Sequence, residues 1–295
     1  MITNRCNLRC SYCVLENAPH QLRAELSLEH KKALVSHLYT NLNFRRLTLS
    51  GGEALLIGKH PPREFIALLN HIRQYRSSNP ADNLQLEVYT NGSYCNDDVV
   101  AAMHGVVDVV AVTIDSVDDE VLRNIGRKHR GEASYLDNIV KVISQLTACG
   151  ITIKLHSVVS TKNIEALASE LRPILAAVHD AAGVVNSWKF YQYMSYDAPE
   201  VDKTHTVTHA AYADFCTQAQ QALQGTGVKL HFKDNQEMNA SLFNILSYGN
   251  AQYMVAGDTW STSRRTEDLR NYASMQELFA RNAIDEERFS KFHEL

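Results

Sequence analysis

The sequence predicts an α/β fold: a partial (βα)6 TIM-like barrel with a C-terminal extension that closes its open side. Short apolar segments alternate with helix-length segments, a pattern typical of parallel strands joined by right-handed crossovers. The apolar runs at 106–114 and 151–159 are almost unbroken, as strands buried on both faces require. Because six such units are counted rather than eight, an open barrel is favoured over a closed one.

A flat doubly wound sheet is the alternative for the same alternation. Its first turn would carry a glycine-rich phosphate-binding pattern, whereas this chain has cysteines there. Polar residues also cluster where the expected strands end, and parallel α/β folds place their sites at those ends. These residues are Glu53, Asn91, Thr113, Lys154, His156, Lys189 and Gln192.

Residues 1–195 are expected to form the barrel core. Residues 1–4 read as the end of a first strand, and apolar positions at helical spacing predict a helix at 28–42 with Ser27 as its N-cap. Further strands are expected at 46–49, 84–89, 106–114, 151–159 and 188–194, with helices at 62–76, 135–149 and 164–178.

Residues 196–295 are expected to form the extension that covers the barrel. A polar loop at 195–208 precedes a helix at 210–224, a short seventh strand at 228–232 and a helix at 235–248. A polar loop at 257–270 then leads to a final amphipathic helix.

Composition limits the possible functions. With 295 residues, of which 45% are hydrophobic and 21% charged, the chain is an ordinary globular protein. A formal net charge of -4 argues against nonspecific nucleic-acid binding. No apolar run approaches the ~20 residues of a membrane span, and no basic-then-apolar leader precedes Cys6. We therefore expect a cytoplasmic protein that binds neither nucleic acid nor a membrane.

Three closely spaced cysteines, Cys6, Cys10 and Cys13, are the strongest chemical signal. A 4Fe-4S cluster normally takes four thiolates, so three without an obvious fourth leave one iron open for another ligand. An open iron indicates catalysis more than electron storage. The other three cysteines stand alone in the sequence: Cys95, Cys149 and Cys216. We expect each to be a small, buried or half-buried hydrophobic residue.

Two other interpretations of the thiols remain. A zinc site would need a fourth ligand, for which His20 is the nearby candidate, although structural zinc loops more often show paired CxxC units. A disulfide framework would leave an odd thiol.

Forty residues further on, Gly51 and Gly52 end a strand and let backbone groups approach a ligand closely. Glu53 can then accept a hydrogen bond from an amine, unless the segment is a mere turn.

Cationic side chains indicate a phosphorylated ligand. Lys154 and Lys189 each interrupt a strand that is otherwise apolar or aromatic, which costs desolvation unless an anion compensates it. Arg127 lies near a strand end, and Arg264 and Arg265 form a pair in the expected loop. Lysine and arginine are the usual partners of phosphate; the alternative for each is a solvated surface charge.

Taken together, these landmarks resemble the radical S-adenosylmethionine (SAM) superfamily and, within it, the viperins, more particularly their prokaryotic homologues. The resemblance runs over nearly the whole chain. Beyond the cysteines and Gly51-Gly52-Glu53, it rests on residues 91–93, 115–121, 125–127, 154–158, 188–192 and 234–238. The Ile-Gly-Arg, Trp-Lys-x-x-Gln and Asn-Gln-x-Met segments narrow it to viperins.

The resemblance implies a 4Fe-4S cluster that cleaves SAM to methionine and a 5′-deoxyadenosyl radical. It further implies removal of the 4′ hydrogen of CTP, UTP or GTP and loss of the 3′ hydroxyl as water. The product would be a 3′-deoxy-3′,4′-didehydro nucleotide that serves antiviral defence. A reductant protein such as flavodoxin or ferredoxin is the implied partner.

The same resemblance assigns roles to individual residues. Cys6, Cys10 and Cys13 would hold the cluster, and Tyr12, Gly51, Gly52, Glu53, Asn91, Thr113 and Arg127 would bind SAM, with Tyr12 near the adenine. Lys154, His156, Lys189, Arg264 and Arg265 would bind the nucleotide. For His156 a satisfied structural role is the alternative. For the whole chain, the alternatives are a radical SAM enzyme acting on a peptide or another small molecule, and a noncatalytic protein that binds a cluster or zinc.

Overall fold

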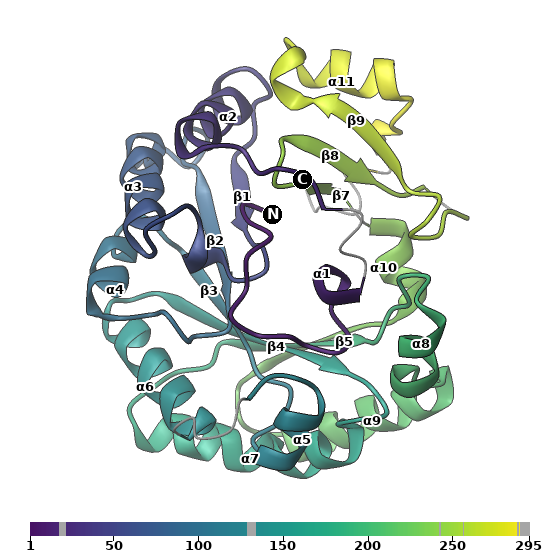
Figure 1. Ribbon diagram of the computed structural model, residues 1–295. Coiled ribbons are helices and arrows are strands. Elements are labelled where there is room, and N and C mark those ends of the chain that lie inside the picture. Colours follow the sequence, from purple (N-terminus) through teal and green to yellow (C-terminus); the bar gives the residue numbers. More distant parts are fainter. Residues whose placement is uncertain (18–21, 129–133, 242, 256, 288, 290–295) are drawn as a thin grey trace.

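A single parallel sheet dominates the computed structural model, which describes all residues except 18–21, 129–133, 242, 256, 288 and 290–295. Its strands are β1 (Arg46–Leu49), β2 (Gln85–Thr90), β3 (Val109–Thr113), β4 (Thr152–Val159), β5 (Ser187–Gln192) and β6 (Lys229–Lys233). They follow one another in chain order, and each pairs in parallel with the next. Over the described residues the order ends at β1 and β6, so the sheet curves into an open barrel (Figure 1), which confirms the predicted fold class.

The strand expected at 1–4 is wrong. This segment contributes only an isolated bridge between Thr3 and Gly51. The sixth strand of the sheet is instead β6, expected as a short seventh strand in the extension. Besides this bridge, the Ile2 N–H donates to the Ser50 carbonyl at 2.6 Å.

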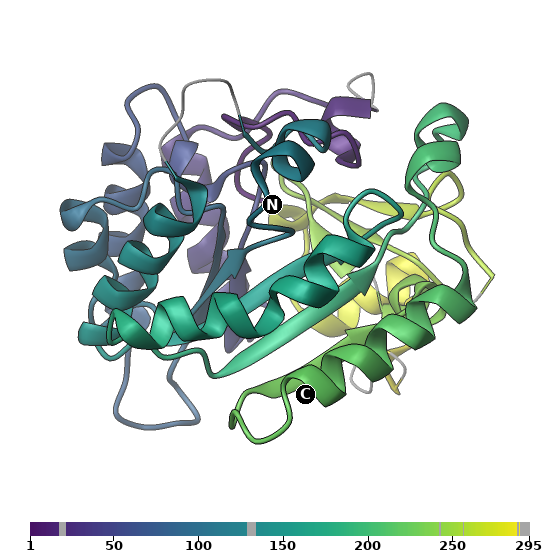
Figure 2. The same cartoon turned by 90° about the horizontal axis from the view of Figure 1, so that it is seen from below.

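Helices cover the outer face of the sheet, because each strand points every second side chain outward. On β2, Leu86 and Val88 are buried in the main hydrophobic core, whereas Glu87 and Tyr89 alternate with them and face the barrel interior. The covering helices are α2 (Leu28–Thr40), α3 (Arg63–Ile72), α4 (Asp97–Met103), α6 (Tyr135–Ala148), α7 (Ile164–Asp180) and α9 (His209–Ala222). Figure 2 shows α7 and α9 side by side beneath the later strands.

The extension differs most from the sequence prediction. The loop expected at 195–208 contains α8 (Pro199–His205), and the helix expected at 235–248 ends early, as α10 (Asn235–Ser241). An antiparallel sheet of β7 (Phe243–Ile245), β8 (Asn250–Tyr253) and β9 (Arg264–Asp268) follows, so the loop expected at 257–270 is partly a strand. Gly249, at φ +98°, lies in the tight turn between β7 and β8, where glycine adopts the positive φ without steric cost.

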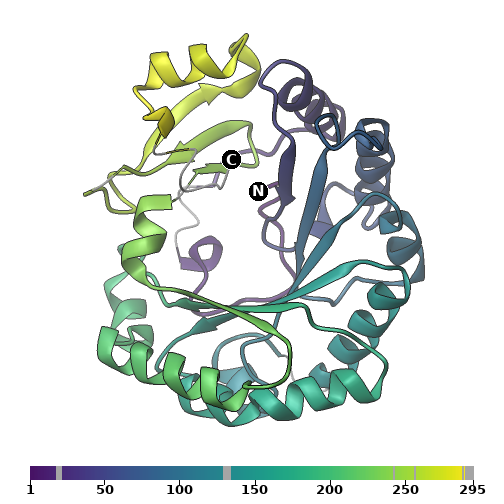
Figure 3. The ribbon, with the colours of Figure 1, turned by 180° about the vertical axis from the view of Figure 1, so that it is seen from behind.

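The extension lies across the open side of the barrel (Figures 1 and 3). Several hydrogen bonds join it to the N-terminal region, among them one from the Ser247 hydroxyl to the Asn4 side chain at 3.0 Å. The Leu26 N–H donates to the Ser247 carbonyl at 3.0 Å, and the His37 ring bonds the Tyr272 carbonyl at 2.7 Å, beside the short helix η4 (Leu269–Asn271). The last described helix is α11 (Met275–Asn282). None of the described helices has the length and apolar character needed to cross a membrane.

Candidate active site

The cysteines lie on a segment, residues 3–13, that we call the cysteine loop. Its first edge runs against the segment after β1. The Gly52 N–H donates to the Thr3 carbonyl at 3.0 Å, and the Glu53 N–H donates to the Arg5 carbonyl at 2.8 Å. A Cβ on Gly52 would lie 2.4 Å from the Arg5 oxygen. The glycine is therefore needed here because the loop itself fills its side-chain space, in addition to any ligand contact.

The second edge of the cysteine loop runs against the segment after α5 (Asp119–Asn124), a short helix that was not predicted. The Arg9 N–H donates to the Gly126 carbonyl at 3.2 Å, and the Ser11 N–H donates to the Ile125 carbonyl at 3.0 Å. The loop is thus held between two segments that each follow a strand of the barrel.

The three thiols differ in exposure: Cys6 is exposed, Cys13 is half-buried and Cys10 is buried. Burial raises the pKa of Cys10 to about 11, although the Arg127 guanidinium opposes the shift, and burial also raises the pKa of Cys6 and Cys13. The thiols must therefore lose protons when they bind a metal. Across the described part of the chain, no three such ligands converge closely enough for a single ion. A 4Fe-4S cubane is larger than a single metal ion, so its cysteine ligands lie further apart than the ligands of one ion. His20, the fourth ligand considered for zinc, lies outside the described residues.

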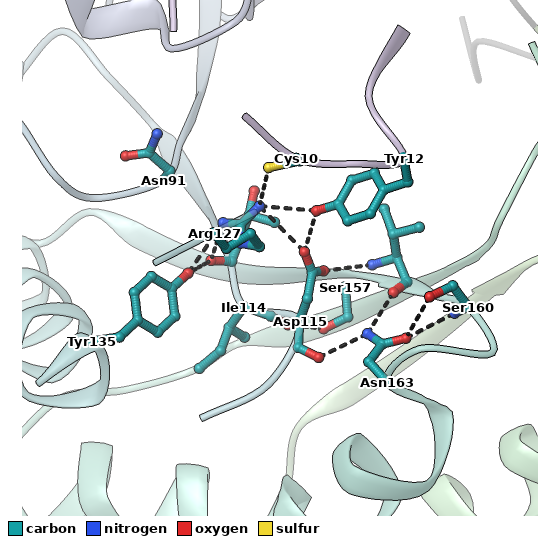
Figure 4. A network of polar contacts seen from close by, with 12 residues as sticks. Cys10, Tyr12, Asn91, Ile114, Asp115, Arg127, Tyr135, Ser157, Ser160 and Asn163 are labelled. Atoms are coloured by element: carbon teal, nitrogen blue, oxygen red, sulfur yellow. Dashed lines mark hydrogen bonds and ion pairs between the residues drawn. The ribbon is translucent and has the colours of Figure 1, made fainter. Parts of the chain in front are cut away.

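A buried ion pair lies directly beneath the loop (Figure 4). The Nη1 atom of Arg127 is 3.2 Å from Oδ2 of Asp115, and both side chains are at most 4% exposed. The Tyr12 hydroxyl donates to the same carboxylate and accepts from Arg127 Nη1 at 3.0 Å. Arg127 Nη1 also lies 3.8 Å from the Cys10 sulfur. This network joins a predicted cluster ligand to two predicted SAM-binding residues.

The far side of the guanidinium holds the end of β3. Its Nη2 donates to the Thr113 carbonyl at 3.3 Å and to the Tyr135 hydroxyl at 3.1 Å. Thr113 therefore takes part through its backbone oxygen. Arg127 Nε is buried without a partner, and an unpaired buried donor is costly. This orphaned donor fits the carboxylate of SAM, the ligand that the resemblance assigns to Arg127, so the residues present are compatible with bound SAM.

Glu53 is buried, and it is already used by the fold. Its carboxylate accepts hydrogen bonds from the Leu55 N–H at 3.1 Å, the Thr90 hydroxyl at 2.8 Å and the Asn91 N–H at 2.7 Å. Asn91 in turn donates to the Asn7 side chain of the cysteine loop at 2.9 Å. Burial raises the pKa of Glu53, and its backbone hydrogen bonds oppose that shift. Glu53 thus links the ends of β1 and β2. This structural role is additional to its predicted hydrogen bond with an amine.

The predicted nucleotide residues of β4 and β5 face the barrel interior. Lys154 is 2.9 Å from a carboxylate oxygen of Glu87, so a protein carboxylate supplies its compensating anion. His156 is buried between the Tyr89 and Tyr191 rings, which it meets edge to face. The centre of its ring lies 4.6 Å from that of Tyr89 and 5.4 Å from that of Tyr191. Burial, assisted by the charges of the neighbouring lysines, lowers the pKa of His156 to about 3. His156 is therefore a neutral side chain.

The strand register places several of these residues at one level. Thr113 pairs with His156, His156 with Lys189, and Lys189 with His231 on β6. We call these four residues the interior rung. Its Thr113 end reaches the Arg127 network through the Thr113 carbonyl. Glu87 and His231 were not predicted as site residues, although the every-second-residue alternation along β2 and β6 could have indicated them.

Arg264 and Arg265 lie on β9, so the expectation that they belong to a loop is wrong. Adjacent residues on a strand point to opposite faces, and both arginines are exposed; their predicted contact with the nucleotide stays a prediction. Arg264 is exposed, with Nη1 3.7 Å from a carboxylate oxygen of Asp258. Sequence reasoning also missed His205 on α8, whose ring bonds the Ser11 hydroxyl at 3.0 Å. No local pattern marks that contact, because 194 positions separate its partners.

Comparisons with known proteins place this site in a family context. A family model described as the Radical SAM superfamily matches residues 1–168. An S-adenosylmethionine-dependent nucleotide dehydratase from Thermoplasmatales archaeon (strain ISO4-H5) is 25% identical over 302 aligned residues, covering 97% of this chain and 94% of the relative. A GTP 3′,8-cyclase from Caulobacter vibrioides is 32% identical over 162 residues, 53% of this chain and 42% of the cyclase. This chain therefore matches less than half of the cyclase's length.

Solved structures agree on the fold. Native anSMEcpe with bound AdoMet is 14% identical, with a TM-score of 0.66 over 99% of this chain and 80% of that one. The superfamily model covers more than half of the 295 residues and includes the cysteine loop. A 4Fe-4S cluster and SAM are the cofactors of that superfamily, and the cysteine loop with its adjoining network fits both. The chain belongs to the radical SAM superfamily.

Proposed function

We propose that the chain is a nucleotide dehydratase of the viperin type. It would remove the 4′ hydrogen of CTP, UTP or GTP and eliminate the 3′ hydroxyl as water, and its role would be antiviral defence. The interior rung carries the proposal, because it sets a lysine and two histidines beside the network that adjoins Cys10. A triphosphate needs such donors, since charge-assisted hydrogen bonds are the strong ones.

Reduced through the cluster, bound SAM would supply the 5′-deoxyadenosyl radical, which keeps the abstracted hydrogen as 5′-deoxyadenosine. Loss of the 3′ hydroxyl as water takes one further electron and one proton. Flavodoxin or ferredoxin would supply the electrons. The chain's own residues position the reactants: Arg127 would bind the SAM carboxylate through its unpaired Nε, and the rung would hold the triphosphate.

Lys154 has a more conditional part in this proposal. Its ammonium already lies 2.9 Å from Glu87, so a phosphate would compete with that carboxylate. His156 is neutral, so it would offer a phosphate one N–H donor without charge. Lys189 would add a second ammonium from the neighbouring strand β5. Its ammonium lies 5.3 Å from the centre of the Tyr191 ring, inside the barrel.

Support also comes from the extent of the likeness. The dehydratase relative matches 97% of this chain, extension included, whereas the cyclase relative matches 53%. A GTP 3′,8-cyclase activity is the second candidate, because the cyclase shows the higher identity. The two reactions differ in product mass: ring closure keeps the mass of GTP, and dehydration lowers it by one water.

A nucleotide screen tests the proposal. Anaerobically reconstituted protein, SAM and dithionite are incubated with CTP, UTP or GTP, and the products are resolved by mass. We expect 5′-deoxyadenosine together with a triphosphate lighter by one water. Lys189→Met should lose this activity, and Lys203→Met, at an exposed ion pair on α8, should keep it. If all three nucleotides leave 5′-deoxyadenosine at the level without substrate, the proposal is wrong.

A further inference from the structure

We propose that Gly126 is a positioning residue for the iron-sulfur cluster. Its missing side chain lets the main chain of Arg9 and Cys10 pass close enough to place the Cys10 thiolate beside the other two. The inference concerns cluster binding alone and does not depend on the nucleotide chemistry proposed above.

The contact at Gly126 leaves no room for a side chain. A Cβ built there would lie 2.0 Å from the Arg9 carbonyl oxygen, 2.8 Å from the Arg9 carbonyl carbon and 3.3 Å from the Cys10 Cα. All three atoms belong to the main chain, so no side-chain rotation relieves the overlap. Any residue other than glycine must push the cysteine loop away from the segment after α5.

Hydrogen bonds on both sides of Cys10 hold the loop at this contact. The Arg9 and Ser11 N–H groups donate to the carbonyls of Gly126 and Ile125, at 3.2 and 3.0 Å. Arg127, the next residue, places Nη1 3.8 Å from the Cys10 sulfur. A displacement at Gly126 would therefore move the thiolate and weaken its nearest cationic contact together.

Cys6 is held separately, at the first edge of the loop. The Arg5 carbonyl, immediately before Cys6, accepts from the Glu53 N–H at 2.8 Å. The separation between Cys6 and Cys10 is thus set by two different barrel segments, one after β1 and one after α5. Metal–ligand distances tolerate errors of only about 0.2 Å, so moving one edge alone would prevent the thiolates from sharing one cubane.

Three glycine variants separate the close contact from backbone strain. Gly126→Ala adds a Cβ at a φ of +75°, and Gly126→Asn adds the same Cβ with a residue that tolerates positive φ better. Gly150→Ala is the matched control, because Gly150 has a φ of +73° and no atom within 4 Å of its added Cβ.

The measurements are iron and sulfide per chain after anaerobic reconstitution and the SAM-induced change in the electron paramagnetic resonance (EPR) spectrum. Circular dichroism of the cluster-free protein checks folding. We expect both Gly126 variants to fold yet bind less than half the wild-type iron, with a correspondingly smaller SAM-induced change. Gly150→Ala should match the wild type. Full iron in Gly126→Ala, equal loss in Gly150→Ala, or full iron in Gly126→Asn alone would each overturn the inference.

A measurement on the wild-type protein covers the case in which the Gly126 variants do not fold. Amide hydrogen exchange at Arg9 and Ser11 should be slow in the cluster-loaded chain, because both amides donate to the segment after α5. Fast exchange at both amides would overturn the inference. Because neither iron binding nor amide exchange requires a nucleotide, the result stands whether or not the nucleotide screen detects a product.

Discussion

The buried pair of Asp115 and Arg127 makes the strongest stability prediction. Asp115→Asn keeps the size of the side chain. Its Oδ1 can still accept from the Val158 N–H, at 2.8 Å in the wild type. The new NH2 group would then face Arg127 Nη1 and the Tyr12 hydroxyl, which are both donors to the carboxylate. The substitution therefore leaves a buried guanidinium without its counter-charge.

Breaking one side of a buried ion pair costs about 3–5 kcal/mol. An unfolding entropy of about 2.1 cal/mol/K per residue gives about 0.6 kcal/mol/K for a chain of this length. The expected fall in Tm is therefore about 5–8 °C, measured by calorimetry on the cluster-free protein. The control is Glu200→Gln, which breaks an exposed ion pair with Lys203 and should shift Tm by less than about 2 °C. If Asp115→Asn has the same Tm as this control, the ion pair does not stabilise the site.

Two further predictions concern the barrel interior. Glu87→Gln should lower the KM for the nucleotide, because it removes the carboxylate that neutralises Lys154, and Lys154→Gln should raise it; each change is about 10-fold or more, as expected for charged hydrogen bonds. Initial rates of 5′-deoxyadenosine formation measure both, and equal KM values in the two variants would contradict the expectation. The pKa of His156 is lowered by burial from 6.5 to about 3, so below pH ~6.5 the unfolded state binds a proton that the folded state does not. His156 should therefore cost the wild type about 1.4 kcal/mol of unfolding free energy per pH unit as pH falls from ~6 to ~4. His156→Asn should lack this dependence in urea titrations at several pH values, and parallel slopes for the two proteins would refute it.

Local patterns predicted the barrel well, because the parallel strands are marked by apolar runs and glycine-bearing ends. The same patterns failed at 235–248 and 257–270. There, short strands pair antiparallel through a tight turn at Gly249, and cross-strand pairing is invisible to helical spacing. The strand expected at 1–4 was wrong because that segment forms only an isolated bridge, between Thr3 and Gly51.

At the site, spacing singled out the thiols and the glycines as candidates, and the resemblance added Arg127; the roles of these residues stay predictions. What those residues contact could not be read from the sequence. Lys154 was expected to seek a phosphate, and the fold supplies Glu87 from a strand two positions away in the sheet. Asp115 stood in a segment used for the resemblance, but its pairing with Arg127 depends on how α5 returns to the cysteine loop.

Isotope transfer tests the central claim most directly. CTP, UTP and GTP carrying deuterium at C4′ are each incubated with reconstituted protein, SAM and dithionite. We predict that the 5′-deoxyadenosine formed with at least one of them carries deuterium, and that the matching triphosphate loses both the label and one water. Unlabelled 5′-deoxyadenosine together with unchanged, fully deuterated nucleotides would contradict the account.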